Sequence, residues 1–278
     1  MIFQLYRSYL QAPEHPAKLP LSRWVGAKKF PKEGIPFKVD RDILLYLHPD
    51  DWLEYMLIKT ELYEPLTLSF IEKNLFIGQT SLFAGTNFGQ HIILASRCAR
   101  DGGCVIGVEP QPRLLYKTHR NIMLNNLPKN IQLVSSALGS QSSLLPMDDA
   151  AYENSGTANL IHSYSKVTFY VYVESLPNLL KKLGRETIDV MLLDVEGYEL
   201  NVLSGLSLKY RPALMIVEVN PSILNIAGQI GVYEALESLE YTCWTLEGKP
   251  ASPGSFLPEQ NVIAVLDKSN LPNWVTNK

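Results

Sequence analysis

The residues best suited to chemistry stand in the stretch LLDVEGYEL, residues 192–200. Asp194, Glu196 and Glu199 place three carboxylates within six positions, and such groups repel one another unless they share a cation, a hydrogen-bond donor or a proton. Asp194 and Glu196 follow an apolar run, so we expect them to line a site at the end of a strand. Glu199 stands where a helix begins, and we expect it to have a helix-start role, because its charge suits the helix dipole.

A second stretch, SLFAGTNFGQHI at residues 81–92, leaves an apolar run through Gly85 and Gly89. Gly85 allows a sharp turn, and Gly89 allows the following helix to lie close to the strand and to a ligand. The nicotinamide fingerprint G-x-G-x-x-G would need glycines where the chain has Asn87 and Gln90, and no Gly-Lys-Ser/Thr follows for a P-loop. A nucleotide-dependent oxidoreductase is therefore disfavoured.

Glu109 ends the next apolar run, CVIGVEP, about twenty residues beyond the glycine turn. An acidic side chain at the carboxyl end of that strand can accept both hydrogen bonds of a ribose diol. After the third strand, Ser136, Ala137 and Leu138 lie where an adenine ring would stack. These positions predict a nucleoside site.

Compact apolar runs alternate with helical patterns from residue 80 onward, and runs that are apolar on both faces suit parallel strands covered by helices. This alternation predicts a doubly wound α/β sheet, whose ligands bind at the carboxyl ends of the strands. Residues 139–174 alternate as antiparallel strands do, and YTCWTLEG and QNVIAVLD form a closing strand pair. We expect residues 1–75 to be an irregular and helical elaboration, with an irregular segment over 11–37, and residues 76–278 to form the main domain.

The bulk composition limits the partners. A net charge of −3 shows no large field of one sign, so we expect neither nucleic acid nor an anionic membrane surface as the main partner. The pairs Lys28-Lys29 and Lys181-Lys182 are expected to be solvated. No apolar run is long enough for a membrane span and no signal peptide is evident, so we expect a cytoplasmic protein.

The chain carries, in this order, the motifs GTNFG, VIGVEP, RNIMLNN, SSALGS, ENSG, LLDVEGYE and LMIVEVNP. Together they resemble the ordered motif set of the FkbM-type methyltransferases. The resemblance runs from Tyr63-Glu64-Pro65 to Asn261-Val262-Ile263-Ala264. It implies a class I methyltransferase, with a Rossmann-like, mostly parallel seven-stranded sheet, S-adenosylmethionine as methyl donor and usually an oxygen acceptor. In one departure, Phe83 replaces an aspartate that is common near the ammonium end of the cofactor, and we expect Glu64 to take its place.

The resemblance also implies the site residues. The cofactor would be bound by Glu64, Gly85, Thr86, Asn87, Phe88, Gly89, Glu109, Pro110, Ser136, Ala137 and Asp194. The acceptor, a small-molecule, sugar, lipid or peptide-like natural product, would contact Tyr63, His162 and Glu218, under a lid formed by residues 1–75 and 139–174. A hydroxyl acceptor would need a general base, for which Asp194, Glu196 and His91 are the candidates, whereas a carboxylate acceptor would need only positioning.

Two alternatives stay open. Asp194, Glu218 and Asn220 resemble the oxygen ligands of magnesium-dependent catechol-type methyltransferases, but nothing in the pattern fixes the direction of Glu218, and we expect no metal. The absence of the aspartate at Phe83 also fits a catalytically inactive cofactor-binding or scaffolding module.

Overall fold

A seven-stranded sheet forms the centre of the computed structural model, which describes residues 2–147 and 169–266. The strand order is β11-β12-β10-β9-β3-β4-β5. The five strands from β10 to β5 are parallel, and β12 runs antiparallel to both β10 and β11. The strands are β3 (Thr80–Ala84), β4 (Cys104–Val108), β5 (Ile131–Val134), β9 (Val190–Leu193), β10 (Leu214–Glu218), β11 (Thr242–Thr245) and β12 (Asn261–Val265). The predicted mostly parallel, doubly wound sheet is confirmed.

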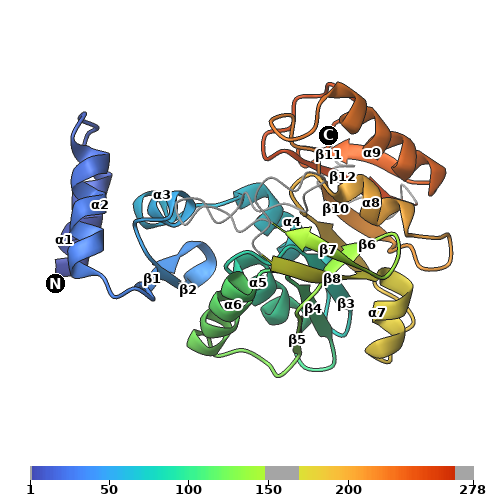
Figure 1. The fold of residues 1–278 in the computed structure, drawn as a ribbon, viewed down its shortest axis with the longest axis horizontal. Helices are drawn as coiled ribbons and strands as arrows, with labels where there is room; N and C mark the ends of the chain where they lie inside the picture. The colour runs from blue at the N-terminus through green and yellow to red at the C-terminus, as the bar shows by residue number, and fades with distance from the viewer. Residues whose placement is uncertain (1, 148–168, 267–278) are drawn as a thin grey trace.

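Helices cover both faces of the sheet (Figure 1). Successive side chains of a strand point to opposite faces, so Phe83 joins one apolar layer while Leu82 and Ala84 join the other. The first layer is completed by α4 (Pro65–Asn74) and α5 (Gln90–Ala99), and α6 (Pro112–Leu124) packs beside them. The second is completed by α7 (Leu176–Lys182), α8 (Glu199–Ser204) and α9 (Ile226–Ser238). The order of the strands reverses at β3 and β9, and such a point is where open α/β sheets bind ligands.

The N-terminal elaboration is more regular than expected. It comprises α1 (Ile2–Gln11), α2 (Lys18–Lys29), β1 (Ile35–Val39), η1 (Asp40–Asp42), β2 (Ile43–Leu47) and α3 (Trp52–Thr60). The prediction of an irregular segment over residues 11–37 was wrong, because Pro20 stands in the first turn of α2, where a missing N–H costs no helical hydrogen bond. Figure 1 shows α1 and α2 at the opposite end of the molecule from α9.

A three-stranded sheet of β6 (Ala137–Gly139), β8 (Phe169–Ser175) and β7 (Ser143–Met147) lies over the main sheet (Figure 1). β7 and β8 pair antiparallel, as the alternating pattern predicts, while β6 runs parallel to β8. The turn ENSG and the candidate acceptor residue His162 lie outside the described residues. No described helix combines the length and hydropathy that crossing a bilayer requires.

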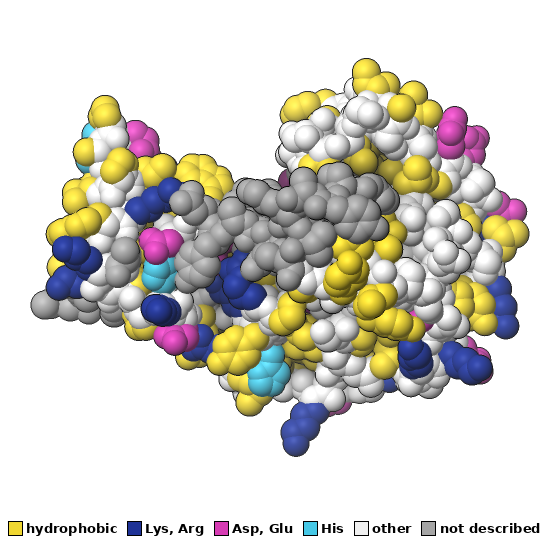
Figure 2. All heavy atoms as spheres, viewed as in Figure 1, with side chains coloured by type: hydrophobic (Ala, Val, Ile, Leu, Met, Phe, Trp, Pro, Cys, Tyr) yellow, Lys and Arg dark blue, Asp and Glu magenta, His cyan; other side chains and the backbone are white. Residues whose placement is uncertain are grey.

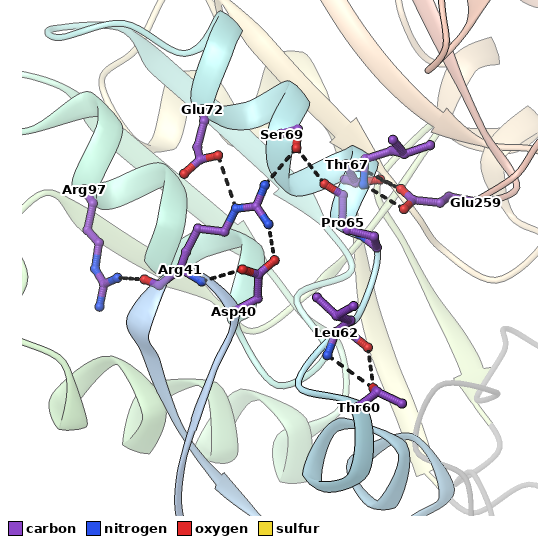
Figure 3. Close-up of polar contacts among 11 residues, drawn as sticks. Asp40, Arg41, Thr60, Leu62, Pro65, Thr67, Ser69, Glu72, Arg97 and Glu259 are labelled. Carbon is purple, nitrogen blue, oxygen red and sulfur yellow. Dashed lines mark hydrogen bonds and ion pairs between the residues drawn. The ribbon is translucent and has the colours of Figure 1, made fainter. Parts of the chain in front are cut away.

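Polar contacts fix α4 from both sides (Figure 3). The guanidinium of Arg41 binds Asp40, Glu72 and Ser69, which ties the turn after β1 to α4. On the other side, the carboxylate of Glu259 accepts the backbone N–H groups of Leu66 and Thr67 at 2.7 Å each. The N-cap residue of α4 provides no side-chain cap of its own. Glu259, from the segment before β12, therefore caps this helix.

We predict that Glu259→Ala lowers the free energy of unfolding by about 1–2 kcal/mol, because two N–H groups at the positive end of α4 lose their acceptor. Chemical denaturation monitored by circular dichroism measures this. Glu247→Ala, which removes an exposed carboxylate paired with Lys249, is the control and should change the free energy by less than about 0.5 kcal/mol. Equal effects of the two substitutions would contradict the capping role.

Candidate functional site

A cavity opens at the carboxyl ends of β3, β4 and β9. It is bounded by the glycine turn after β3, by the end of β4 with the start of α6, by β6 and β7, and by the loop after β9. The lining residues are Ala84, Gly85, Asn87, Val108, Glu109, Pro110, Gln111, Leu114, Ala137, Leu138, Met147, Asp194, Val195, Glu196 and Tyr198. The cavity therefore lies at the reversal point of the strand order.

The glycine turn passes against the end of β9. Gly85 has a φ of 84°, and a Cβ there would collide with the carbonyl oxygen of Asp194. Gly89 has a φ of 89°, and its Cβ would lie 2.9 Å from Cγ2 of Thr118. Asn87, between them, also has a positive φ of 47°, which asparagine tolerates better than most residues. The predicted sharp turn at Gly85 is present, whereas the close approach at Gly89 is to Thr118 of α6 and not to the strand or to a ligand.

Glu109 holds this turn. Its carboxylate is 3% exposed, and one oxygen accepts the N–H groups of Thr86 at 3.1 Å and Asn87 at 3.3 Å. The other oxygen accepts the N–H of Gln111 at 3.0 Å. Burial raises the pKa of Glu109 to about 7, against the opposing effect of the three N–H groups. Each carboxylate oxygen carries two lone pairs, so the three N–H groups leave one lone pair for a ribose hydroxyl and not the two that the predicted ribose contact needs.

Two polar side chains of α6 complete the support of the turn, and sequence reasoning missed both. Thr118 donates its hydroxyl to the carbonyl of Asn87 at 2.7 Å. Asn121 donates its amide to the carbonyl of Phe88 at 2.7 Å and accepts the N–H of Tyr46 from β2 at 2.8 Å. Both side chains are fully buried. In the sequence, these two residues could have been found only as polar side chains on the inward, otherwise apolar face of an amphipathic helix.

The loop after β9 is held by a second buried carboxylate. One oxygen of Glu199 accepts the N–H groups of Val195 and Gly197 at 3.1 Å each. Glu199 is fully buried and is the first residue of α8. Its contacts order the loop that carries Asp194 and Glu196, and Glu196 itself has a φ of 54°. Left-handed backbone at a non-glycine residue is strained and commonly found at functional sites.

Four acidic side chains, Glu64, Asp194, Glu196 and Glu218, interact beside the cavity, and we call them the carboxylate cluster. Burial is the largest cause that raises the pKa of each, and their mutual repulsion raises it further for Glu64, Glu196 and Glu218. The pKa of Glu196 rises to about 8. Asp194 and Glu218 share a hydrogen bond that lowers the pKa of Asp194 and raises that of Glu218. Glu218 therefore keeps its proton and donates it to an ionised Asp194.

Tyr63 and His91 lie against the same cluster. Nε2 of His91 is 3.5 Å from a carboxylate oxygen of Glu64, and their side chains are only 13% and 16% exposed. Burial lowers the pKa of His91 to about 4, so the imidazole is neutral near pH 7. The ring of Tyr63 lies 5.5 Å from that of Phe88 and 6.1 Å from that of His91. The structure thus gathers Tyr63, Glu64, His91 and Glu218 next to Asp194.

Besides Tyr63, Glu64, His91 and Glu218, the predicted site residues in the described part of the chain form two sets. Those that line the cavity are Gly85, Asn87, Glu109, Pro110, Ala137, Asp194 and Glu196. Thr86, Phe88, Gly89 and Ser136 stand behind the lining, and the 1% exposed Phe88 packs in the apolar core. The lining includes Leu138, which was expected beside the adenine ring, and the lining residues that sequence reasoning missed are mostly apolar and include Leu114 and Met147. Apolar residues of this kind look like ordinary core positions in a sequence.

The lining suits a nucleoside that carries a cation. Leu114, Leu138 and Met147 offer an apolar wall, and the ionised Asp194 offers negative charge. None of the described lining residues is Lys or Arg, so a pyrophosphate would find no cationic side chain there. Within residues 2–147 and 169–266, no group of three or more His, Cys, Asp or Glu side chains has an arrangement that could hold a metal ion.

Comparison with known proteins identifies the family. The family model described as "Methyltransferase FkbM domain" matches residues 84–241, more than half of the chain. No curated protein matches the chain. The chain belongs to the FkbM methyltransferase family, and the predicted resemblance is confirmed. S-adenosylmethionine is accordingly its cofactor.

Solved structures with a similar fold include several methyltransferases. An O-methyltransferase from Bacillus cereus in complex with SAH is 11% identical, with coverage of 95% of this chain and 99% of that chain and a TM-score of 0.43. A precorrin-6y C5,15-methyltransferase from Geobacter metallireducens is 14% identical, with coverage of 72% and 86% and a TM-score of 0.42. A SAM-dependent methyltransferase from Aquifex aeolicus is 14% identical, with coverage of 72% and 87% and a TM-score of 0.40.

We predict that Gly85→Ala abolishes binding of S-adenosylhomocysteine, because the added Cβ forces the turn away from the end of β9. Isothermal titration calorimetry measures the binding. Gly102→Ala is the matched control, since Gly102 has a φ of 96° but no heavy atom within 4 Å of its Cβ position. Backbone strain alone should cost each variant about 1 kcal/mol of stability. Similar loss of binding in both variants would show that the contact with Asp194 is unimportant.

A pH dependence of stability follows from the carboxylate cluster. The pKa of Glu196 rises from 4.5 to about 8 on folding, so its contribution is fully present below pH 4.5 and is lost as the pH rises through 8. Glu196→Gln should reduce the decline of the unfolding free energy across this range by up to about 1.4 kcal/mol per pH unit. Urea denaturation at several pH values, with Glu237→Gln as the surface control, tests this. An unchanged slope in Glu196→Gln would contradict the burial of this carboxyl group.

Proposed function

We propose that this FkbM-family methyltransferase transfers the methyl group of S-adenosylmethionine to a hydroxyl oxygen of a neutral or cationic small-molecule, sugar or peptide-like acceptor. The observation that carries the proposal is the shared hydrogen bond between Asp194 and Glu218 at the edge of the cavity. It provides an ionised carboxylate whose pKa is raised toward neutrality, and a general base works best under that condition.

Different residues around the cavity would bind different parts of the cofactor. Glu109 would accept a hydrogen bond from one ribose hydroxyl through its remaining lone pair. Ala137, Leu138 and Met147 would cover the adenine ring. The cationic methionine end would then extend toward Asp194 and Glu64, where the negative charge favours it. When bound, the cofactor supplies an electrophilic methyl group on its sulfonium sulfur.

The chain's own contribution is alignment and proton removal. Asp194 would accept the proton of the acceptor hydroxyl while the new C–O bond forms, and Glu218 would hold Asp194 in place through its own proton. Glu196 and the neutral His91 would border the acceptor, and either could carry the proton onward. The buried, largely apolar surroundings would exclude water that competes for the methyl group.

The charge of the cluster distinguishes between acceptors. An anionic carboxylate would have to approach the ionised Asp194, and no Lys or Arg lies among the described residues that line the cavity. Like charges at short range in a buried site are strongly unfavourable. A hydroxyl acceptor meets no such barrier, and an amine elsewhere on the acceptor would be attracted.

The alternative function, an inactive binding module, was suggested by the absence of an aspartate at position 83. Phe83 is 2% exposed and packs in the apolar layer of the sheet. Glu64 lies close enough to Asp194 for the charge of Asp194 to raise its pKa. Glu64 therefore provides an acidic group beside the cavity without an aspartate at position 83. A measurement of turnover distinguishes the methyltransferase from the inactive module.

We predict that Glu109→Gln mainly affects cofactor binding and that Asp194→Asn mainly affects turnover. Glu109→Gln should weaken binding of S-adenosylhomocysteine about tenfold to a hundredfold, because a charge-assisted acceptor is lost. Asp194→Asn should also weaken binding, because the charge beside the methionine end is lost, and at saturating S-adenosylmethionine it should slow methyl transfer by a further factor of about 10²–10⁴, because the general base is lost. Calorimetry measures the binding. Turnover is measured as the transfer of labelled methyl from S-adenosylmethionine to a panel of hydroxyl, amino and carboxyl compounds, and Glu186→Gln is the surface control.

The labelled product also reports the acceptor atom. A methyl ether withstands mild alkali, whereas a methyl ester releases volatile methanol. Release of labelled methanol would contradict the hydroxyl acceptor, and full turnover by Asp194→Asn would contradict the base. Binding of S-adenosylhomocysteine without transfer to any compound of the panel would favour the inactive module.

A further inference from the structure

The net charge of the chain is distributed very unevenly. Residues 1–32 contain six basic residues and one acidic residue, which gives a net charge of +5. The other 246 residues contain 19 basic and 27 acidic residues, which gives −8. The overall value of −3 averages over these two parts, so the expectation of a chain without a strong field of one sign does not hold for its N-terminal segment.

The basic segment forms a helical hairpin, α1 with α2, that is fixed to the rest of the protein. The hydroxyl of Tyr6 donates to the carbonyl of Ser22 at 3.1 Å, and the ring of Tyr6 lies 5.1 Å from that of Phe30. Arg7 donates to the carbonyl of Ile58 at 3.1 Å and pairs with Glu61 at 3.0 Å. The hairpin therefore presents a defined outer surface.

That outer surface is apolar as well as basic. Leu5 on α1 is 64% exposed, and Leu21 and Trp24 on α2 are 43% and 56% exposed. Residues 21, 24 and 28 follow each other at helical spacings of three and four, so Leu21, Trp24 and Lys28 share one face of α2. The ammonium of Lys28 lies 4.6 Å from the ring centroid of Trp24. Figure 2 shows hydrophobic and basic side chains side by side over α1 and α2.

The charge on this surface is available to a partner. Arg7 and Lys18 are paired with Glu61 and Glu14, respectively. Lys28, Lys29 and Lys32 are exposed, and none forms an ion pair with a described residue. We call these exposed residues of the hairpin and of the turn after it the hairpin surface: Leu5, Leu21, Trp24, Lys28, Lys29 and Lys32.

We propose that the hairpin surface docks the protein on an anionic lipid bilayer. Stable attachment to such a bilayer needs both apolar insertion and charge attraction, and the hairpin surface offers the two together. Tryptophan favours the headgroup level of a membrane, where its ring is apolar and its N–H is hydrated. The negative remainder of the protein is repelled by the same bilayer, so the attraction also sets the orientation.

Other occupants of the surface fit it less well. A nucleic acid would use the lysines but would gain little from exposed leucines, because its backbone contacts are polar and charged. A second copy of the chain would bring the same three lysines to a symmetric contact, where they would repel one another. Both occupants are outcomes of the test.

Sedimentation with lipid vesicles tests the proposal on the full chain. We expect wild type to pellet with vesicles of phosphatidylcholine and phosphatidylglycerol, to stay in solution with phosphatidylcholine alone, and to detach at high salt. Lys28→Glu with Lys29→Glu should weaken binding by at least about fivefold for each lysine removed. Leu21→Ser with Trp24→Ser should also abolish pelleting, while the controls Lys129→Glu with Arg185→Glu, and Phe256→Ser, should pellet as wild type does.

The controls carry the same changes of charge and polarity at exposed positions outside the hairpin, and the circular dichroism of every variant establishes that it is folded. Wild type that stays in solution with the mixed vesicles, or control variants that lose binding equally, would overturn the proposal. So would tighter binding to a single-stranded oligonucleotide than to the vesicles, measured by fluorescence anisotropy. A dimer on size-exclusion chromatography that Leu21→Ser with Trp24→Ser dissociates would identify a second copy as the occupant.

Discussion

The site depends on carboxylates that are buried at the end of a sheet and satisfied by backbone N–H groups. Glu109 accepts three such groups from the turn after β3 and the start of α6, and Glu199 accepts two from the loop after β9. A buried acceptor without a donor is costly, so each of these side chains fixes the path of the loop around it. Two neighbouring loops that line the cavity are therefore shaped by the same interaction.

The same burial sets the chemistry next to these loops. Acidic side chains that gather away from solvent raise one another's pKa, and a shared proton is the least costly way for two of them to coexist. Asp194 and Glu218 adopt this arrangement, with the proton on Glu218. Glu64 enters the cluster from the N-terminal cap of α4, in a left-handed conformation at a φ of 46°. A cationic ligand would relieve the repulsion, so the site favours positive charge even before any specific contact forms.

The sequence predicted the parts of the protein that local patterns determine. Apolar runs on both faces predicted the parallel strands, and the position of Glu109 at a strand end predicted its place beside the cavity. Long-range effects were missed. Thr118 and Asn121 support the glycine turn through contacts more than thirty positions away, and no local pattern signals such partners. The helix over residues 18–29 was missed because proline usually interrupts a helix, although the first turn of a helix accepts it. The basic hairpin was missed because the net charge was averaged over the whole chain.

The cap on α4 joins residues 193 positions apart. Glu259 precedes β12, the strand that inserts between β10 and β11, whereas α4 precedes the first strand of the main sheet. During synthesis the helix that carries Glu64 must wait for nearly the entire main sheet to emerge before its N-terminus acquires an acceptor. Contacts of such wide separation form late, because the chain must first close a long loop. In a nascent chain, the carboxylate cluster would therefore be completed only after Glu259 has emerged. The ability to bind the cofactor would then arrive late in folding.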